Sequence, residues 1–550
     1  MSDSIAEAPP ALSDNGMTHR QIMVVFSGLM LGLMLAALDQ TIVSTALLTI
    51  VRDLNPVNGT SQMPWVVTAY LLSSTAVTPI YGKLADLYGP KKIYMFAIGL
   101  FLLGSALCGM SQNMSELIGF RALQGLGGGG LMALTFTIIG SVVSPRERGK
   151  YQGYFGGVFM LAMVIGPLIG GFFTDQAKLF GVSGWRFIFY VNLPIGLAAL
   201  VVISIVLHVK GDNRKHKIDY TGAALVVAGA CALLLAAQLG SNGQYAWGSS
   251  VIISLFVVGA VLVLAFIGWE FKLASEPLLP MPLFRNPVFS VSNAMAFVVG
   301  LTMMGSLIYL SYYLQLVVGY SPTKAGLAIL PMMAGIMPAS IIAGKLITKM
   351  GKYRPFPIAG TALSVVGMFL LSRITLQTGA LERSIYMFIL GVGLGLVMPV
   401  LTLAVQNALP FKDIGTGTSA NLFFRNMGSS FGTAIFGAIL TNRLTHYMAQ
   451  ATQGKPSAGS SSDLSNLTKS QLAALDVKNP GIEYAVLHSF VEAMSVVFAT
   501  AAVIMAVAFV LSLFLKQVSL RSNGPAAGSS PAQGEDDSEF ADIAAAPAMH

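Results

Sequence analysis

The chain has 550 residues, of which 54% are hydrophobic and only 10% are charged, and its formal net charge is +8. Because a soluble protein carries about a quarter charged residues, this composition excludes an ordinary soluble protein and indicates a helical protein that crosses a membrane many times. Its apolar runs are continuous for about twenty residues, which disfavours a membrane barrel, whose strands alternate over about ten.

The first eighteen residues are polar and include Pro9-Pro10, and we expect them to form a disordered cytoplasmic tail. The next segment, from about 22 to 50, is apolar and long enough, at about 1.5 Å per residue, to cross roughly 30 Å of hydrocarbon. No small-residue cleavage site follows a short apolar core here, so we expect this segment to stay in the protein as the first span.

Asp39 lies in the middle of this first span, within the sequence LDQTIV. An ionised carboxylate in a membrane costs about 3 kcal/mol on insertion scales, so such a group usually faces a bundle interior or a watery cavity. There it can take up and release a proton. The alternative is a structural role, in which Asp39 pairs with a buried arginine or caps a neighbouring backbone.

Window hydropathy predicts thirteen further apolar runs, which makes about fourteen spans in all. They lie at 64–82, 92–110, 115–143, 151–173, 187–208, 219–239, 249–269, 288–314, 324–347, 355–374, 384–409, 418–441 and 485–515. Cys108 and Cys231 fall inside two of these runs, so the sequence predicts neither a disulfide framework nor a metal site.

Lysine and arginine residues gather in alternate connections between the predicted spans. One set of connections carries them at 83–92, 146–150, 210–217, 272–285 and 349–354, whereas the connections at 111–115 and 241–247 carry none. The positive-inside rule places the first set, and with it both chain termini, in the cytoplasm. Topology therefore explains the positive net charge, and no nucleic-acid partner is expected.

The stretch 82–92 (GKLADLYGPKK) is the connection between the second and third spans, and part of it is repeated. Gly344-Lys345-Leu346 and Gly351 follow at an offset of 262 residues (344 − 82 and 351 − 89). Parallel repeats of this kind are expected in a transporter with two similar halves. Because eight spans separate the copies instead of six, two extra spans are predicted in the middle.

This connection resembles the loop signature of the major facilitator superfamily. The resemblance implies a conformational gate formed by the residues that match the motif, namely Gly82, Asp86, Gly89, Lys91 and Lys92. Asp86 can lie at a helix N-terminus or pair with a cation, and such a contact can break when the halves move. In the second copy Thr348 replaces the aspartate, so only the first copy is expected to carry the charged contact.

Arg121 lies within the span 115–143 and precedes five glycines, at 125 and 127–130. An arginine there cannot lose its charge, so it needs an anionic or carbonyl partner. The glycines predict a thin, flexible helix wall. The segment resembles the fourth-helix motif of the superfamily, which implies that Arg121 takes part in proton coupling with Asp39. A purely structural arginine is the alternative.

Gly166 and Pro167 lie in the fifth span and are followed by Gly170 and Gly171. The proline removes a backbone hydrogen bond and kinks the helix, and the glycines permit close helix crossing. The segment resembles the antiporter motif, which occurs in exporters and is largely lacking from uptake members. This resemblance predicts export.

Four further stretches of the sequence resemble signatures of the fourteen-span drug:proton antiporters. They are LDQTIV at 38–43, WRFIFYVNLPIG at 185–196, PLFRN at 282–286 and GYSP at 319–322. The resemblance implies an all-α polytopic membrane protein with two six-helix bundles, two inserted central helices and alternating access by a rocker-switch motion.

Arg425 lies in the thirteenth span, where some relatives carry an acid for cationic drugs and this sequence has none. Position alone suggests Tyr70, Gln124, Gln315, Asn421, Phe424 and Arg425 as residues of a substrate cavity. His488 and Glu492 are one helical turn apart and can pair, although helix ends often hold such residues.

Domain boundaries follow from the predicted spans. We expect an N-tail at 1–18, an N-terminal bundle at 19–208, two inserted helices with their loops at 209–287, a C-terminal bundle at 288–515 with a long external loop at about 442–484, and a disordered C-tail at 516–550. The tail is rich in Gly, Ser, Pro and Ala and carries Glu535, Asp536 and Asp537, so it cannot bury enough apolar surface to fold.

The sequence therefore predicts a monomeric exporter in the cytoplasmic membrane that exchanges external protons for an amphiphilic drug or antibiotic. It predicts no enzymatic activity and no cofactor, because the glycines at 127–130 lack the Gly-Lys-Ser/Thr ending of a phosphate loop. Two alternatives remain open: a dedicated exporter of one natural product, lipid, siderophore or peptide, and a membrane sensor that does not transport.

Overall fold

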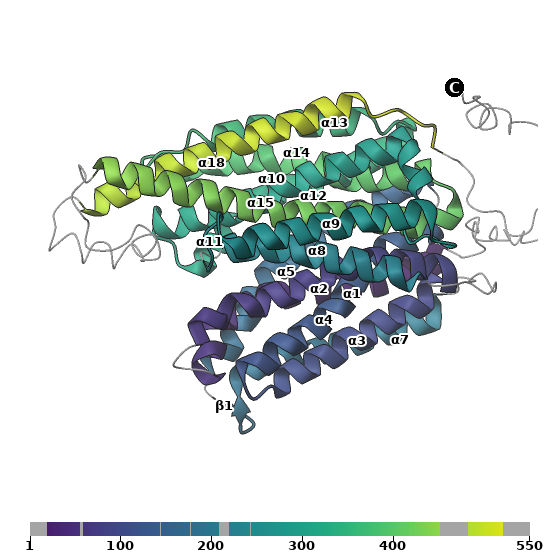
Figure 1. Cartoon of the computed structure of the whole chain (residues 1–550), viewed down its shortest axis with the longest axis horizontal. Helices are drawn as coiled ribbons and strands as arrows, with labels where there is room; N and C mark the ends of the chain where they lie inside the picture. The colour runs from purple at the N-terminus through teal and green to yellow at the C-terminus, as the bar shows by residue number, and fades with distance from the viewer. Residues whose placement is uncertain are drawn as a thin grey trace, which may run out of the picture.

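The computed structural model describes residues 19–54, 59–143, 145–176, 178–207, 219–241, 244–451 and 482–520 (Figure 1). Long helices that run side by side dominate it, and both described termini lie at the same end, which we call the terminal end. The predicted N-tail, most of the long loop at 442–484 and the acidic C-tail lie outside the described residues.

The N-terminal half is a bundle of long helices, the last of which is broken near its start. A two-stranded antiparallel hairpin, β1 (Lys178–Leu179) with β2 (Val182–Ser183), lies before that break. The helices are α1 (His19–Leu54), α2 (Gly59–Tyr88), α3 (Pro90–Met110), α4 (Met114–Val142), α5 (Pro145–Asp175), the 3-10 turn η1 (Gly184–Arg186), α6 (Phe187–Tyr190) and α7 (Asn192–Val206).

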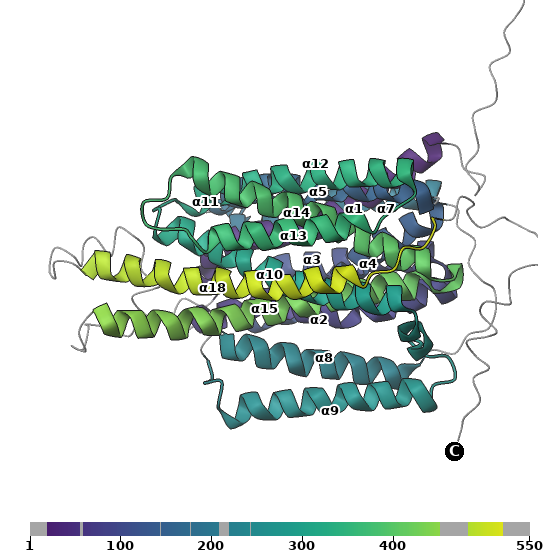
Figure 2. The same cartoon turned by 90° about the horizontal axis from the view of Figure 1, so that it is seen from above.

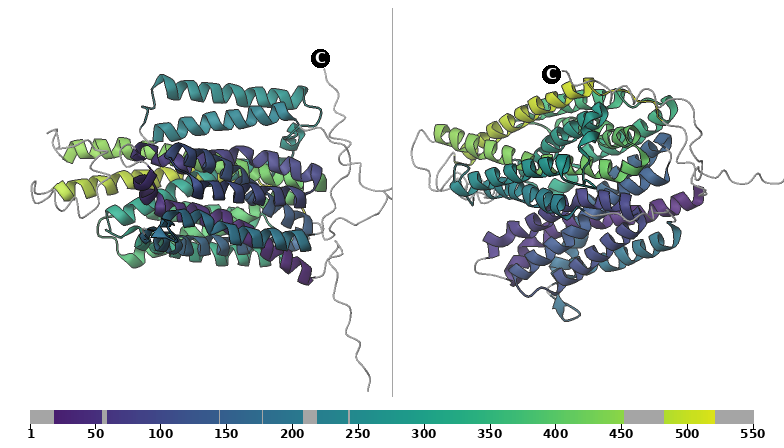
Figure 3. Two further views of the ribbon diagram at one scale, coloured as in Figure 1. Left: turned by 90° about the horizontal axis from the view of Figure 1, so that it is seen from below. Right: turned by 45° about the vertical axis from the view of Figure 1, so that its right-hand side comes forward.

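The C-terminal half is a second bundle, in which the short helix α11 precedes α12. Its elements are η2 (Met281–Arg285), α10 (Pro287–Leu316), α11 (Pro322–Ala328), α12 (Leu330–Met350), α13 (Pro355–Leu371), α14 (Ala380–Ala408), η3 (Phe411–Asp413), α15 (Ile414–Ala451) and α18 (Ile482–Leu513). Between the halves in sequence come α8 (Tyr220–Ser241) and α9 (Ser250–Lys272), which pair with each other at one side of the molecule (Figures 2 and 3).

Length and composition make eleven of the described helices able to cross a membrane, and α13 is a shorter apolar helix. The helices α2 and α15 fall outside this set, although both were predicted as spans. Both are rich in serine, threonine and glycine and pack against each other, so protein instead of lipid surrounds much of their surface. With α2, α13 and α15 included, the predicted arrangement of about fourteen spans in two six-helix bundles with two inserted helices is confirmed.

The two halves meet chiefly through two helix pairs, α2 with α15 and α5 with α12, and α4 and α5 make further contacts with α15 and α14, respectively. The inserted helix α8 contacts both α2 and α15 and therefore bridges the first of these pairs. The repeat seen in the sequence has a structural counterpart, because Gly89 has φ 86° at the start of α3 and Gly351 has φ 67° at the end of α12. Left-handed backbone of this kind favours glycine.

Two predicted boundaries are wrong. Helix α15 continues to Ala451, ten residues past the predicted end of that span, so the long loop begins later than 442. The expected disordered tail does not begin at 516, because the hydroxyl of Tyr353 donates to the carbonyl of Lys516 at 2.7 Å. The side chain of Gln517 also accepts from the amide of Arg354 at 3.0 Å.

Candidate functional site

Asp39 and Arg121 form a buried ion pair between α1 and α4. Their Oδ2 and Nη1 atoms are 2.5 Å apart, and each residue is 1% exposed. The sequence predicted both as a proton-coupling pair, and the structure brings them together. Removing charges from water is expensive, so a buried pair of this kind requires that its remaining polar atoms also find partners.

Asp39 satisfies this requirement through two amide side chains from other helices. The other carboxylate oxygen, Oδ1, accepts from Nε2 of Gln124 at 2.7 Å and from Nδ2 of Asn192 at 3.1 Å. Asn192 also donates to Oγ of Ser105 at 3.0 Å, which links α7 to α3. Asp39 is therefore the shared acceptor of α4 and α7.

Arg121 has neutral partners in addition to Asp39. It donates to Oε1 of Gln124 at 2.8 Å and to the carbonyl of Val66 at 3.3 Å. Its guanidinium also lies 4.4 Å above the ring of Tyr70, a favourable cation–π contact. When Asp39 is neutral, Arg121 therefore keeps polar partners from α2 and α4.

The glycines that follow Arg121 allow α4 to pack closely against its neighbours. A Cβ on Gly129 would lie 2.3 Å from the carbonyl oxygen of Ser74 on α2, and a Cβ on Gly127 would lie 2.4 Å from the amide of Phe101 on α3. Helix α4 is thus wedged between α2 and α3, and this close packing positions Arg121 and Gln124.

Gly166 connects the ion-pair centre to α5. A Cβ at this position would lie 2.0 Å from Oγ1 of Thr41, two residues after Asp39. The hydroxyl of Thr41 also donates to the carbonyl of Ala162 at 3.0 Å. Of the other predicted motif residues, Pro167 lies inside α5, Gly170 is buried, and Gly171 has open space at its Cβ position.

Asp86 reaches across the interface between the halves at the terminal end. Its carboxylate accepts from the amides of Gly415 and Thr416 at 2.8 and 2.7 Å and from the Thr416 hydroxyl at 2.8 Å. These groups form the N-terminus of α15, which favours a negative charge. Gly82 permits the approach, because a Cβ there would lie 2.5 Å from the carbonyl oxygen of Gly415.

The remaining predicted gate residues make no hydrogen bond or ion pair with the described residues of α15. Gly89 makes the turn between α2 and α3. The ammonium of Lys91 donates to the carbonyl of Ser204 at 2.7 Å, within the N-terminal half, and Lys92 is exposed. Of the predicted gate residues, Gly82 and Asp86 therefore form the contact between the halves. The others belong to the connection between α2 and α3 within the N-terminal half.

The residues suggested for a substrate cavity do not form one group. Tyr70 and Gln124 belong to the ion-pair centre. Asn421 lies in a polar cluster of the C-terminal half, where it donates to Oδ1 of Asn293 at 3.2 Å. Gln315 bonds to Ser311 on its own helix.

The last two suggested residues are neighbours on α15 but have different surroundings. The ring of Phe424 lies 6.3 Å from that of Phe284 in an apolar contact. The side chain of Arg425 is half-buried.

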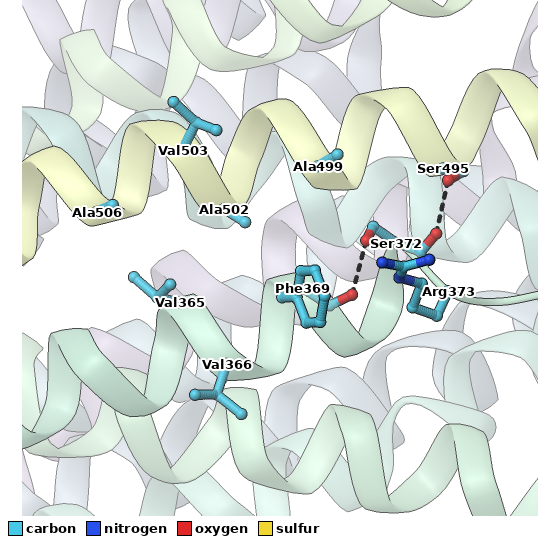
Figure 4. Close-up of a pocket in the computed structure, with 10 residues that line it drawn as sticks. All are labelled: Val365, Val366, Phe369, Ser372, Arg373, Ser495, Ala499, Ala502, Val503 and Ala506. Carbon is cyan, nitrogen blue, oxygen red and sulfur yellow. Dashed lines mark hydrogen bonds between the residues drawn. The ribbon is translucent and has the colours of Figure 1, made fainter.

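A groove of about 570 Å³ lies between α13 and α18 (Figure 4). Apolar side chains line most of it, and Ser372, Arg373 and Ser495 gather at one end, where Oγ of Ser495 donates to the carbonyl of Ser372 at 2.6 Å. None of its lining residues contacts Asp39, so the groove is separate from the ion-pair centre.

Sequence reasoning missed Asn192 and Ser105 as partners of the centre. Asn192 stood in a motif at the start of a membrane helix, and a polar side chain there was an available signal. The suggested pair of His488 and Glu492 is 4.0 Å apart with both side chains about half exposed, which makes it a weak surface contact. The described residues contain no group of three or more potential metal ligands.

Comparisons with known proteins agree with this architecture. The model of the Major Facilitator Superfamily matches residues 29–433. The multidrug transporter protein MdtP of Bacillus subtilis (strain 168) is 36% identical over 529 residues, which cover 92% of this chain and 95% of that protein. Multidrug resistance protein 3 of the same organism is 37% identical over 471 residues, which cover 86% of this chain and 90% of that protein.

Among solved structures, that of the human organic anion transporter MFSD10 (TETRAN) matches with a TM-score of 0.59 at 13% identity. The match covers 89% of this chain and 99% of that one. At this identity the likeness shows the fold alone.

Proposed function

This chain belongs to the major facilitator superfamily and is an efflux transporter, and we propose that it exchanges external protons for amphiphilic drugs or antibiotics. The buried Asp39–Arg121 pair is the observation that carries the proton coupling. The names of the two Bacillus relatives, a multidrug transporter and a multidrug resistance protein, support drugs as substrates.

We place the protein in the cytoplasmic membrane with the terminal end inside the cell. Lysine and arginine in the connections at that end, such as 83–92 and 349–354, support this orientation. In this orientation the Asp86 contact with α15 closes the cytoplasmic side. We propose that the transporter acts as a monomer. It needs no cofactor as an energy source, because one charge that moves through 100 mV supplies about 2.3 kcal/mol.

Asp39 carries the proton. Protonation from outside removes the negative charge that holds Arg121, Gln124 and Asn192 together. Arg121 then relies on Gln124, the Val66 carbonyl and the Tyr70 ring, which are already in place. Those neutral partners lower the cost of breaking the ion pair, so the two protonation states of Asp39 can both be populated.

The change at Asp39 reaches the second half of the protein through α5. Thr41 packs into the space left by Gly166, and α5 in turn contacts α12. A shift of α1 during protonation therefore moves the α5–α12 interface. The Asp86 contact at the other interface, between α2 and α15, breaks when the halves rock and reforms when the cytoplasmic side closes.

Efflux of ethidium from energised cells tests the proposal. Wild type should lower the cellular ethidium signal, and both Asp39→Asn and a protonophore should abolish this efflux. Efflux that continues at full rate in the presence of the protonophore would contradict proton coupling. Export that is intact in Asp39→Asn would remove Asp39 from the mechanism, provided that surface expression of the variant equals that of wild type.

A further inference from the structure

Arg425 differs from Arg121 in having no partner within the described part of the chain. Among the described residues its guanidinium makes no hydrogen bond, ion pair or ring contact. The side chain is half-buried, and none of its nitrogens is among the fully enclosed unpartnered atoms. A permanent cation within a membrane helix is costly unless an anion or water compensates it.

The position of Arg425 directs it toward the interior of the protein. It lies one helical turn after Asn421, on the face of α15 that contacts α10 and α14: Asn421 donates to Asn293 and accepts from Thr402. One turn further, a Cβ on Gly428 would lie 2.0 Å from the carbonyl oxygen of Phe297 on α10. Helices α2, α8 and α18 cover other sides of α15, as Figure 2 also shows.

The polar cluster beside Arg425 offers further hydrogen-bond donors and no acid. Nδ2 of Asn293 and Oγ of Ser292 are buried polar atoms without a partner. Asn293 is 2% exposed and Ser292 0%, so bulk water does not supply the missing contacts. An arginine with neighbouring unfilled donors is a chemical match for an anionic group.

We propose that Arg425, with the cluster of Asn293 and Asn421, binds the negatively charged group of the exported substrate, so that amphiphilic organic anions are a preferred substrate class. This inference rests on the proposed efflux function and adds the charge of the substrate to it. The recognised group is a carboxylate, sulfonate or phosphate ester attached to an apolar body. The Asp39 centre cannot play this role, because Asp39 already pairs with its arginine.

The Asp39–Arg121 centre and the Arg425 centre thus have different roles in the two halves of the protein. In the N-terminal half an acid and an arginine neutralise each other and exchange a proton. In the C-terminal half the arginine is left for the substrate. A substrate anion supplies the negative charge that Arg425 lacks, and it leaves when the surroundings of Arg425 open to water outside the cell.

Two dyes with the same ring system and opposite charge test this inference. Cells that express wild type, Arg425→Gln, Arg425→Lys or Arg373→Gln are loaded with fluorescein, an anion, or rhodamine 6G, a cation, and efflux is followed with and without a protonophore. Arg373 is the matched control, because it is an exposed arginine at the end of α13. Surface expression and size-exclusion profiles confirm that each variant is folded.

We expect wild type to export fluorescein in preference to rhodamine 6G. Arg425→Gln should lower fluorescein efflux by about tenfold or more, as truncation of one partner of a buried charge pair does, and should leave rhodamine 6G efflux unchanged or raised. Arg425→Lys should keep part of the fluorescein efflux, since it keeps the charge and loses the planar fork. Arg373→Gln should leave both dyes unchanged.

The inference is wrong if wild type shows no preference for fluorescein, or if Arg425→Gln lowers the efflux of both dyes equally. Either result leaves the proposed function standing as long as the protonophore stops dye efflux; efflux that ignores the protonophore contradicts the proposed function instead. Fluorescein anisotropy with the purified full-length protein separates an organic-anion site from one for any small anion. Displacement of the dye by inorganic phosphate at equal concentration would overturn the organic-anion assignment.

Discussion

Asp39 of α1 and Arg121 of α4 are in contact at 2.5 Å, although 82 residues separate them in the chain. Neither side chain is accessible to solvent, and the amide groups of Gln124 and Asn192 complete the surroundings of the carboxylate. The pair ties three helices of the N-terminal half to a group that can change its charge. Protonation of Asp39 would therefore change the contacts that hold α1, α4 and α7 together.

Removing one charge of this pair should destabilise the protein more than removing both. Arg121→Gln leaves Asp39 as an uncompensated buried charge, a change that costs about 3–5 kcal/mol in comparable cases. The double variant Asp39→Asn with Arg121→Gln removes the unpaired charge and should recover most of the lost stability without recovering proton-coupled efflux. The apparent melting temperature of the purified protein, measured for both single variants and the double variant, checks this expectation. Equal stability of Arg121→Gln and wild type would contradict it.

Gly166→Ala should impair efflux, because the added methyl group has no room between α5 and α1. The ideal Cβ position lies 2.0 Å from Oγ1 of Thr41 and 2.6 Å from its Cβ, so the helices have to separate. Overpacking of this kind costs about 1–3 kcal/mol. Ethidium efflux and the apparent melting temperature should both fall.

Gly119→Ala is the control for this change. Gly119 lies on α4 with nothing within 4 Å of its Cβ position, so the same methyl group is added in open space. Alanine also favours helix over glycine by about 1 kcal/mol. If the two alanine variants behave alike, contact between α1 and α5 at Thr41 is not needed for transport.

Hydropathy predicted most of the membrane-spanning helices, whereas their grouping into two bundles with two inserted helices came from the repeat and the family resemblance. Apolar runs such as 249–269 correspond to helices that face lipid. Composition predicts such helices well because a surface in contact with lipid has to be apolar. Helix ends were less predictable: α15 continues to Ala451 through polar residues, which hydropathy assigns to a loop. The attachment of residues 516–520 to Tyr353 depends on individual hydrogen bonds, which composition does not reveal.

The candidate site was predicted in part. Charge in an apolar run identified Asp39 and Arg121 because ionised groups are rare there. Their partners were not identified, since Asn192 lies 153 residues from Asp39 in the chain and only the packing of α1 against α7 brings them together. The contact of Lys91 with the Ser204 carbonyl likewise depends on tertiary structure. The pattern of charges in the sequence could not show that Lys91 bonds within its own half instead of at the gate.

Asp86→Ala should loosen the contact between the halves at the terminal end. The change removes the acceptor of three hydrogen bonds at the start of α15, and bonds to a charged group contribute about 1.5–3 kcal/mol each. A cysteine introduced as Ser419→Cys, in a Cys108→Ala and Cys231→Ala background, lies against Gly82 and reports opening. Its labelling by N-ethylmaleimide should become faster by about tenfold or more.

Asp413→Ala provides the comparison for the gate variant. It removes a carboxylate from η3, at the same end of the molecule, but leaves the contacts of Asp86 with Gly415 and Thr416 in place. Labelling at position 419 should therefore stay at the wild-type rate. A similar acceleration in both variants would mean that general negative charge, and not the cap on α15, holds this end closed.

The charge of the substrate determines how membrane potential should affect efflux. If one proton enters for each monovalent anion that leaves, two positive charges move inward in effect, and 100 mV contributes roughly twice 2.3 kcal/mol. If one proton enters for each monovalent cation that leaves, no net charge moves. Valinomycin with potassium, which collapses the potential, should therefore inhibit fluorescein efflux strongly and spare rhodamine 6G efflux, whereas nigericin, which collapses the pH gradient, should inhibit both. Fluorescein efflux that valinomycin does not affect would rule out this electrogenic exchange, and with it the pairing of one proton at Asp39 with an anion at Arg425.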